Sequence, residues 1–272
     1  MQGIDHPIRT LRDVGELLRE WRQRRHLTQR QLATAAGLSG QLLGAIETGR
    51  ELPSRDAILR LADQLNLPLR DRNTILAVAG YTAAFPQRCL DDPVLAGISD
   101  MVERIVRDHA PFPALALDHR WGIVASNDVL RRLIGGVDPA LLSTPVNWAR
   151  VVLHPAGLAP RIANLAAWRG HVLTRLRRHF EQTADAVVAD LLEEIGDYPS
   201  PTATTKIAPD GVAVPLCLMT VDGLLTFYGA SAVFASAVDV ALAELTIETF
   251  YPADAETLAI MRRQAAQPTT AD

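Results

Sequence analysis

Two short helical patterns with a glycine between them occupy residues 27–49, and they restrict the fold more than any other stretch of the chain. Thr28 can cap the first pattern through its hydroxyl, and Gly37 ends it. Small and apolar residues at Leu32, Ala33, Ala35 and Ala36 give this helix a closely packed side. The spacing predicts two helices joined by a tight turn.

The second pattern begins after Ser39, a good N-cap, and stops at Gly49, which can take a positive φ. Its inward stripe is formed by Leu42, Leu43 and Ile46. The opposite face holds mostly small residues, namely Gly40, Gln41, Gly44, Ala45 and Thr48. Such a helix can bring its backbone deep into a major groove, and Gln41 is its only strong base reader. Two amphipathic helices with a glycine turn also occur in folds that never touch DNA.

The motif resembles the Xre/Cro-type helix-turn-helix, with Leu-Thr-Gln at 27–29, Leu-Ala at 32–33, Gly-Leu-Ser at 37–39 and Ile-Glu-x-Gly-Arg at 46–50. The resemblance implies that Gln29 bonds a phosphate and orients the reader helix, and that Glu47 is structural. It also implies base contacts from Ser39, Gly40 and Gln41, and phosphate contacts from Arg50, Ser54 and Arg55. We add Arg30, Ala45 and Thr48 as candidate DNA-binding residues.

Helical patterns flank the motif at 14–25, 54–65 and about 70–79, which predicts an all-α five-helix domain over residues 1–82. That segment has twelve arginines and nine acidic residues, a net charge of +3 within a chain of net charge −4. The basic head agrees with a nucleic-acid partner. Arg22, Arg24, Arg25 and Arg30 form its densest patch, although a solvated helix face explains each of them as well.

Residues 83–93 lack a helical stripe and contain two prolines, so we interpret them as a linker to a second domain at 94–272. Asp92 and Pro93 start a helix in which Val94, Ile98, Met101, Val102 and Ile105 share a face. A hairpin at 114–127 follows, then a short helix, then two long helical patterns at 162–180 and 184–195. Strands at 212–221 and 224–234 meet in an expected type I′ turn at Asp222-Gly223, and a third runs from about 242 to 250. A final helix is capped at Asp254.

This order predicts an α+β, PAS-like domain, an antiparallel sheet with helices on one face. Three segments, 113–127, 147–158 and 160–169, make the chain similar to the MmyB-like transcription regulators. The resemblance implies a sensor domain, and the apolar strands indicate a small apolar effector, with a fatty acid or similar lipid as the leading candidate. The candidate ligand-binding residues are Leu115, Leu117, Trp121, Asn127, Trp148, His154, Arg161, Trp168, Leu216, Leu218, Leu225 and Phe227.

Each of these side chains has a simpler structural explanation. The apolar ones suit a plain core, tryptophan fills cores as readily as pocket rims, and Arg161 or Arg169 can form surface salt bridges instead of pairing with a ligand carboxylate. His171 and His179 lack an acidic residue at ligand spacing, so we expect no metal and no resident cofactor. Nucleophile elbows, phosphate loops and zinc-protease motifs are absent from the sequence, which argues against an enzyme.

The sequence therefore predicts a cytoplasmic regulator that binds double-stranded DNA and has no membrane span. Its two cysteines, Cys89 and Cys217, support neither a disulfide framework nor a zinc site. One head buries little surface, so we expect a homodimer on an inverted-repeat operator. In the alternative, the C-terminal domain binds no ligand and serves dimerisation or protein docking.

Overall fold

The structure, a computed structural model, describes residues 5–199 and 213–266. The chain divides into two compact units. The first consists of Met1–Arg88 with Glu181–Thr183 and Ser236–Ala243, and the second of Cys89–Phe180, Ala184–Ala235 and Glu244–Asp272. The N-terminal unit is built on five helices, and the C-terminal unit combines an antiparallel sheet with helices, as the fold class predicted.

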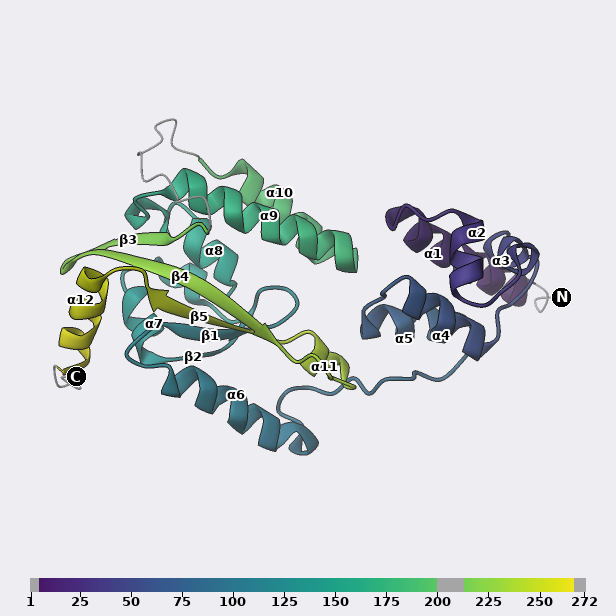
Figure 1. Ribbon diagram of the computed structural model, residues 1–272, viewed down its shortest axis with the longest axis horizontal. Coiled ribbons are helices and arrows are strands. Elements are labelled where there is room, and N and C mark those ends of the chain that lie inside the picture. Colours follow the sequence, from purple (N-terminus) through teal and green to yellow (C-terminus); the bar gives the residue numbers. More distant parts are fainter. Residues whose placement is uncertain (1–4, 200–212, 267–272) are drawn as a thin grey trace. The chain divides into compact units, whose positions relative to one another are not determined.

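The helices of the N-terminal unit are α1 (Asp5–Arg24), α2 (Gln29–Ala35), α3 (Gly40–Glu47), α4 (Arg55–Gln64) and α5 (Leu69–Val78) (Figure 1). The first helix begins nine residues before the Val14 expected from the sequence. It crosses α3 so closely that a Cβ on Gly15 would collide with the carbonyl oxygen of Ile46 and lie 3.2 Å from the Cα of Glu47. A glycine is therefore required at this crossing.

The predicted helix ends of the motif are confirmed. Thr28 and Gln31 form a capping box at α2, with the Gln31 amide donating to Thr28 Oγ1 at 3.2 Å and the Thr28 amide donating to Gln31 Oε1 at 2.8 Å. The Ser39 hydroxyl caps α3, accepting from the Leu42 amide at 3.1 Å. Gly37 and Gly49 each have a φ of +65°. Ala35, which we expected on the packed side of α2, is exposed; Leu32, Ala33 and Ala36 are buried.

Within residues 114–199 and 213–266, the sheet of the C-terminal unit has five antiparallel strands in the order β2-β1-β5-β4-β3. They are β1 (Ala114–Leu117), β2 (Ile123–Ser126), β3 (Leu216–Thr220), β4 (Gly223–Val233) and β5 (Thr246–Pro252). Both predicted hairpins are present. Val212, the expected start of the strand that became β3, lies outside the described residues.

The helices around this sheet are α6 (Ala96–Asp108), α7 (Asp128–Leu133), α8 (Trp148–Leu153), α9 (Leu165–Thr183), α10 (Ala186–Asp197) and α12 (Ala255–Ala266). The short helix α11 (Val240–Ala243) belongs to the first unit. Short 3₁₀ turns occupy Pro93–Leu95, Pro139–Leu142 and Ala159–Arg161. In Figure 1, α8, α9 and α10 lie over one face of the sheet and α6 over the other, so helices cover both faces and not only the one face that we expected. The main core lies on the first face, and a smaller cluster joins Val102 and Val106 of α6 to Ala114, Ala116 and Ile247.

Three local predictions in this unit are wrong. Of the face predicted for the helix at α6, Ile98 and Val102 pack in the smaller cluster, whereas Val94, Met101 and Ile105 are exposed at 70%, 40% and 42%. Leu95, just before α6, and Val106 are buried in their place. The hairpin turn occupies residues 221–222 instead of 222–223; only Gly223 has a positive φ, so it is not a type I′ turn. The last strand begins at Thr246, because residues 240–243 form α11.

Candidate functional site: a helix-turn-helix and an apolar core with a polar seam

A buried carboxylate fixes the geometry of the helix-turn-helix. Glu47, at the end of α3, accepts hydrogen bonds from Arg22 Nε at 2.6 Å and Arg22 Nη2 at 2.8 Å. Gln29 Nε2 donates to the same carboxylate at 2.7 Å. Only 1% of the Glu47 side chain and 11% of the Arg22 side chain are exposed, and the hydrogen bond to Glu47 raises the pKa of Arg22. The three side chains join α1, α2 and α3, so Glu47 is structural.

Hydrogen bonds within the N-terminal unit limit the DNA-binding roles of Arg22, Arg25 and Gln29. Arg22 forms a buried ion pair with Glu47, so it does not belong to the basic patch that we expected to bind DNA phosphates. Arg25 Nε donates to the Leu65 carbonyl oxygen at 2.9 Å. Gln29 is exposed at the start of α2 and already holds Glu47, an arrangement that suits the orienting role inferred from the family resemblance.

The free face of α3 carries the small residues that the sequence singled out. Gly40, Gln41 and Thr48 are exposed, and Gly44 and Ala45 are half-buried. A Cβ at Gly40 would meet nothing within 4 Å, and one at Gly44 would only approach Gln29 Oε1 at 3.9 Å. Packing within the chain therefore requires neither glycine.

Polar side chains at the ends of α3 and α4 border this face. The Thr48 hydroxyl donates to the Gly44 carbonyl at 2.7 Å, and Arg50 Nε donates to the Thr48 hydroxyl at 2.9 Å. Ser54 caps α4, accepting from the Ala57 amide at 3.2 Å. Arg30, Ser39, Arg50, Ser54 and Arg55 are all exposed.

In the C-terminal unit, nine of the twelve candidate ligand-binding residues share one core cluster. Its predicted members are Leu115, Leu117, Trp121, Trp148, Trp168, Leu216, Leu218, Leu225 and Phe227, each at most 5% exposed. Phe250 of β5 joins them through edge-to-face contacts with Trp148 and Phe227, at ring-centroid distances of 6.2 and 6.4 Å. The apolar candidates from distant segments are thus brought together.

The three polar candidates are engaged with the backbone. Asn127 caps α7 and bonds the amides of Ala114 and Leu130 and the carbonyls of Val106 and Phe112. All four of its hydrogen-bonding positions are therefore used. Its role in the structure is to join α6, β1 and α7.

His154 and Arg161 hold loops in a similar way. His154 Nδ1 accepts from the Ala156 amide at 3.0 Å, and Arg161 Nη1 donates to the carbonyls of Leu133 and Gly135, each at 3.1 Å. Arg169, considered for a ligand carboxylate, donates to the carbonyls of Ile195 and Gly196.

Sequence reasoning missed a polar seam beside the core, which we define as Trp168, His171, Arg175, Ser231 and Glu248. Glu244, Thr246 and Glu248 alternate with Leu245 and Ile247 along the chain, a pattern that predicts a solvent-exposed Glu248, yet this residue is only 2% exposed. Arg175 of α9 pairs with both of its carboxylate oxygens, Nη1 donating to Oε2 at 3.1 Å. The only sequence signal was Arg175, His171 and Trp168 at spacings of four and three on one helix.

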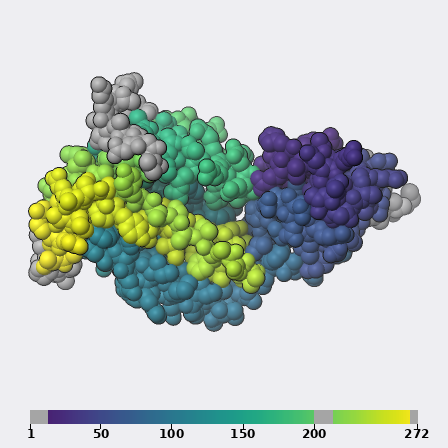
Figure 2. Space-filling view, viewed as in Figure 1, coloured from purple at the N-terminus to yellow at the C-terminus, as the bar shows by residue number. Residues whose placement is uncertain are grey.

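The far half of β4 leaves this seam close to the surface. Residues Tyr228 to Val233 are exposed, and this yellow-green strand runs along the surface of the unit in Figure 2. Ser231 pairs in register with Glu248, and Gly229 with Phe250. The polar seam and the aromatic part of the core are therefore successive positions on one face of the sheet.

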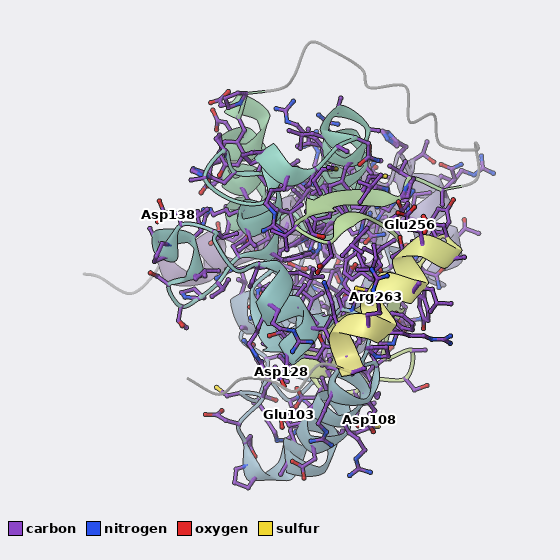
Figure 3. All side chains as sticks on the ribbon, turned by 90° about the vertical axis from the view of Figure 1, so that its left-hand side faces the viewer. Glu103, Asp108, Asp128, Asp138, Glu256 and Arg263 are labelled. Atoms are coloured by element: carbon purple, nitrogen blue, oxygen red, sulfur yellow. The ribbon has the colours of Figure 1, made fainter. Side chains whose placement is uncertain are left out.

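A separate groove of about 690 Å³ lies between α6, β2, α7 and the end of α12. Its lining includes the charged residues Glu103, Arg107, Asp128 and Arg132. Figure 3 shows Glu103 and Asp128 on the same side of the unit. Asn127 is the one candidate ligand-binding residue that borders it. Its charged lining suits a polar ligand, in contrast to the apolar candidates.

The two units define a class of protein, a DNA-binding helix-turn-helix followed by a PAS-like domain. A family model described as the MmyB-like transcription regulator ligand binding domain matches residues 98–263, and a helix-turn-helix domain model matches residues 13–75. The chain belongs to the MmyB-like transcription regulators. No helix among the described residues combines the length and apolarity needed to cross a membrane.

Shorter similarities fall on the N-terminal unit. The chain is 41% identical over 56 residues to the ImmF control region 10 kDa protein of Bacillus phage phi105, covering 21% of this chain and 62% of that protein. It is 39% identical over 74 residues to the uncharacterized HTH-type transcriptional regulator RghRB of Bacillus subtilis (strain 168), covering 27% and 51%. The chain thus spans about half to three fifths of these relatives.

A crystal structure of the restriction-modification controller protein C.AhdI from Aeromonas hydrophila is also similar. It is 35% identical, covering 23% of this chain and 94% of that chain, with a TM-score of 0.22.

Proposed function

We propose that this regulator reads a specific operator in double-stranded DNA with α3 and that its C-terminal domain binds a small apolar effector. The observation that carries the first part is the free face of α3. Packing within the chain does not require glycine at positions 40 and 44. The absence of side chains there would instead let the backbone of α3 approach a binding partner closely, as in the major groove of DNA. Gln41 would read a base edge between them.

The proposed DNA contacts fall into two groups. Ser39, Gly40, Gln41, Ala45 and Thr48 face base edges, whereas Gln29, Arg30, Arg50, Ser54 and Arg55 bind phosphates. The exposure of Arg30, Arg50, Ser54 and Arg55 supports the second group. Arg30 lies in the first turn of α2, and Ser54 and Arg55 lie at the start of α4, where free backbone amides add to the attraction for phosphate.

Subunit pairing would give the short reader helix useful specificity. A single small DNA-binding module buries limited surface, and two heads about one helical turn apart would read an inverted repeat. The exposed apolar face of α6, formed by Met101 and Ile105 and continued by Val94 in the turn before the helix, is a suitable pairing surface. We expect Met101→Glu with Ile105→Glu to shift a dimer to monomer in light-scattering chromatography, whereas Val187→Glu, at another exposed apolar position, should not.

The effector would occupy the region where the apolar candidates meet. Leu115 and Leu117 of β1 and Leu225 and Phe227 of β4 lie on one sheet face, and Trp168 of α9 packs in the same cluster. Burying a twelve-carbon chain there would contribute roughly 0.8 kcal/mol per methylene group. A fatty acid or a similar lipid therefore remains our leading effector. Because the protein would act on DNA, we place it in the cytoplasm. The proposed function includes no catalytic step.

The same α6 face also supports the second candidate function, a C-terminal domain that only dimerises or docks on another protein. The candidates differ in how effectors act, because an allosteric effector must bind the DNA-competent and DNA-incompetent states with different affinities. Lipid addition would change operator affinity in the first case and leave it unaltered in the second.

The experiment for the DNA part is selection of bound sequences from a random duplex library, followed by footprinting. We expect an inverted repeat whose half-sites lie about one turn apart. A protected single, asymmetric half-site would contradict the dimer, and binding without any selected sequence would contradict operator recognition.

A further inference from the structure

Trp168, on the sheet-facing side of α9, has a buried donor without an acceptor. The residue is 4% exposed, and its indole Nε1 has no hydrogen-bond partner among the described residues. Its ring lies over the His171 ring, 5.2 Å between centroids and 30° between planes. Buried N–H groups are nearly always paired, because an unmade bond costs the full desolvation of the donor. The unpaired indole N–H of Trp168 therefore points to a ligand atom that accepts a hydrogen bond from it.

The rest of the polar seam carries no surplus charge. Arg175 is the cation of the seam, and both oxygens of Glu248 already accept from it. The Ser231 hydroxyl donates to Glu248 Oε1 at 3.0 Å, and the Arg175 guanidinium carbon lies 5.0 Å from the centre of the Trp121 ring. An anion entering here would meet a neutralised guanidinium and a buried carboxylate. Charge balance therefore favours an uncharged group.

His171 does not add a positive charge to the polar seam. Burial lowers its pKa, and the neighbouring Arg175 lowers it further, while Glu248 raises it. The imidazole is accordingly neutral at physiological pH. The seam thus offers an N–H donor from Trp168 within a neutral polar environment.

The register of β4 and β5 orients an elongated molecule. Ser231 and Glu248 form one cross-strand pair, and Gly229 and Phe250 form the next pair on the same face. Successive same-face positions are roughly 7 Å apart. A Cβ on Gly229 would lie 3.6 Å from the Phe250 ring. Gly229 thus lies beside this ring and places no side chain between the polar seam and the aromatic part of the core. A hydrocarbon chain against Phe250 would bring a terminal oxygen to the seam.

We propose that the polar seam binds an uncharged oxygen of the effector, a hydroxyl, carbonyl or ester, which accepts the hydrogen bond of Trp168 Nε1. This inference rests on the proposed lipid effector and narrows its chemistry. Within the lipid class it selects alcohols, esters and lactones over ionised fatty acids, whose carboxylate would face Glu248.

The test measures the binding of dodecanol and dodecanoate to the full chain at neutral pH by calorimetry. The two probes share a hydrocarbon chain and differ in the charge of the head group. We expect dodecanol to bind at least about tenfold more tightly than dodecanoate. Trp168→Phe keeps an aromatic ring and removes the donor, so it should weaken dodecanol binding about tenfold. Trp21→Phe, the same substitution in the N-terminal unit, should leave both affinities unchanged.

Arg175 provides a second variant with a matched control. Arg175→Gln leaves Glu248 without its counter-charge and should widen the preference for dodecanol, whereas Arg177→Gln, an exposed position on the same helix, should not. The ratio of the two affinities separates recognition from a general loss of packing, which would weaken both probes alike.

Tighter binding of dodecanoate than of dodecanol by the unaltered chain would overturn the inference, as would unchanged dodecanol affinity in Trp168→Phe. Both results would leave the lipid effector standing. If neither probe bound, the proposed lipid effector itself would fail. The comparison on the unaltered chain holds even if a variant does not fold.

Discussion

Glu47→Gln should destabilise the helix-turn-helix by about 3–5 kcal/mol, the cost of removing one partner from a buried ion pair. The substitution keeps the shape of the side chain. It removes the charge that accepts from Arg22 Nε and Nη2 and from Gln29 Nε2, at 2.6, 2.8 and 2.7 Å. The Arg22 guanidinium, on a side chain only 11% exposed, would then lack a counter-charge. Domain stabilities of about 5–15 kcal/mol make this loss a large fraction of the total.

Hydrogen exchange of the α3 amides in the full chain measures this effect, because it reports local opening without requiring the two units to unfold together. Glu51→Gln is the matched control, since Glu51 is exposed and should change the opening free energy by less than about 0.5 kcal/mol. Replacing the pair together, Arg22→Met with Glu47→Leu, should restore most of the protection. A Glu47→Gln cost no larger than that of the control would refute the assigned role.

Three further predictions concern packing, pH and DNA recognition. Gly15→Ala should destabilise the N-terminal unit, because the added Cβ would collide with α3. Gly170→Ala on α9, where a Cβ would meet nothing within 4 Å, should stabilise its own unit by up to about 1 kcal/mol. Equal effects of the two substitutions in thermal unfolding would contradict the close α1–α3 crossing. Because burial lowers the pKa of His171, the unfolded chain binds its proton more readily, so stability should fall as pH drops below about 6.5, and His171→Gln should flatten that loss in denaturant titrations. Gln41→Ala should cost about 1–3 kcal/mol on the selected operator and little on random DNA, whereas Arg55→Gln should weaken both equally; anisotropy titrations that showed the reverse would exchange their roles.

Local chemistry explains what the sequence could predict. Thr28, Ser39 and Ser54 each precede an apolar helical stripe, and each caps the expected helix, because a side-chain oxygen satisfies the free amides of the first turn. The hairpins and the N-cap at Asn127 follow the same logic. The signals concern residues within a few positions of one another, where tertiary packing has little to override.

The errors arise where two distant segments decide the outcome. Helix α6 is apolar over a wide arc, and its packing against β1 and β5 selects Val102 and Val106 while Met101 remains exposed. Glu248 looked like an outward residue of an alternating strand; Arg175, on α9, makes its burial possible. The sequence placed Arg22 in a basic patch, whereas in the structure it pairs with Glu47 of α3. A single sequence does not encode such partners within any local window.

The central claim is that the C-terminal domain of this DNA-binding regulator carries a small apolar effector. Native mass spectrometry of the purified full chain, followed by denaturing extraction of any copurified molecule, tests it most directly. We expect one lipid-sized molecule to be released per chain, with an uncharged oxygen in its structure. Protein that carries no such molecule and shows no thermal shift with dodecanol or dodecanoate would contradict the sensor and favour the dimerisation or docking role.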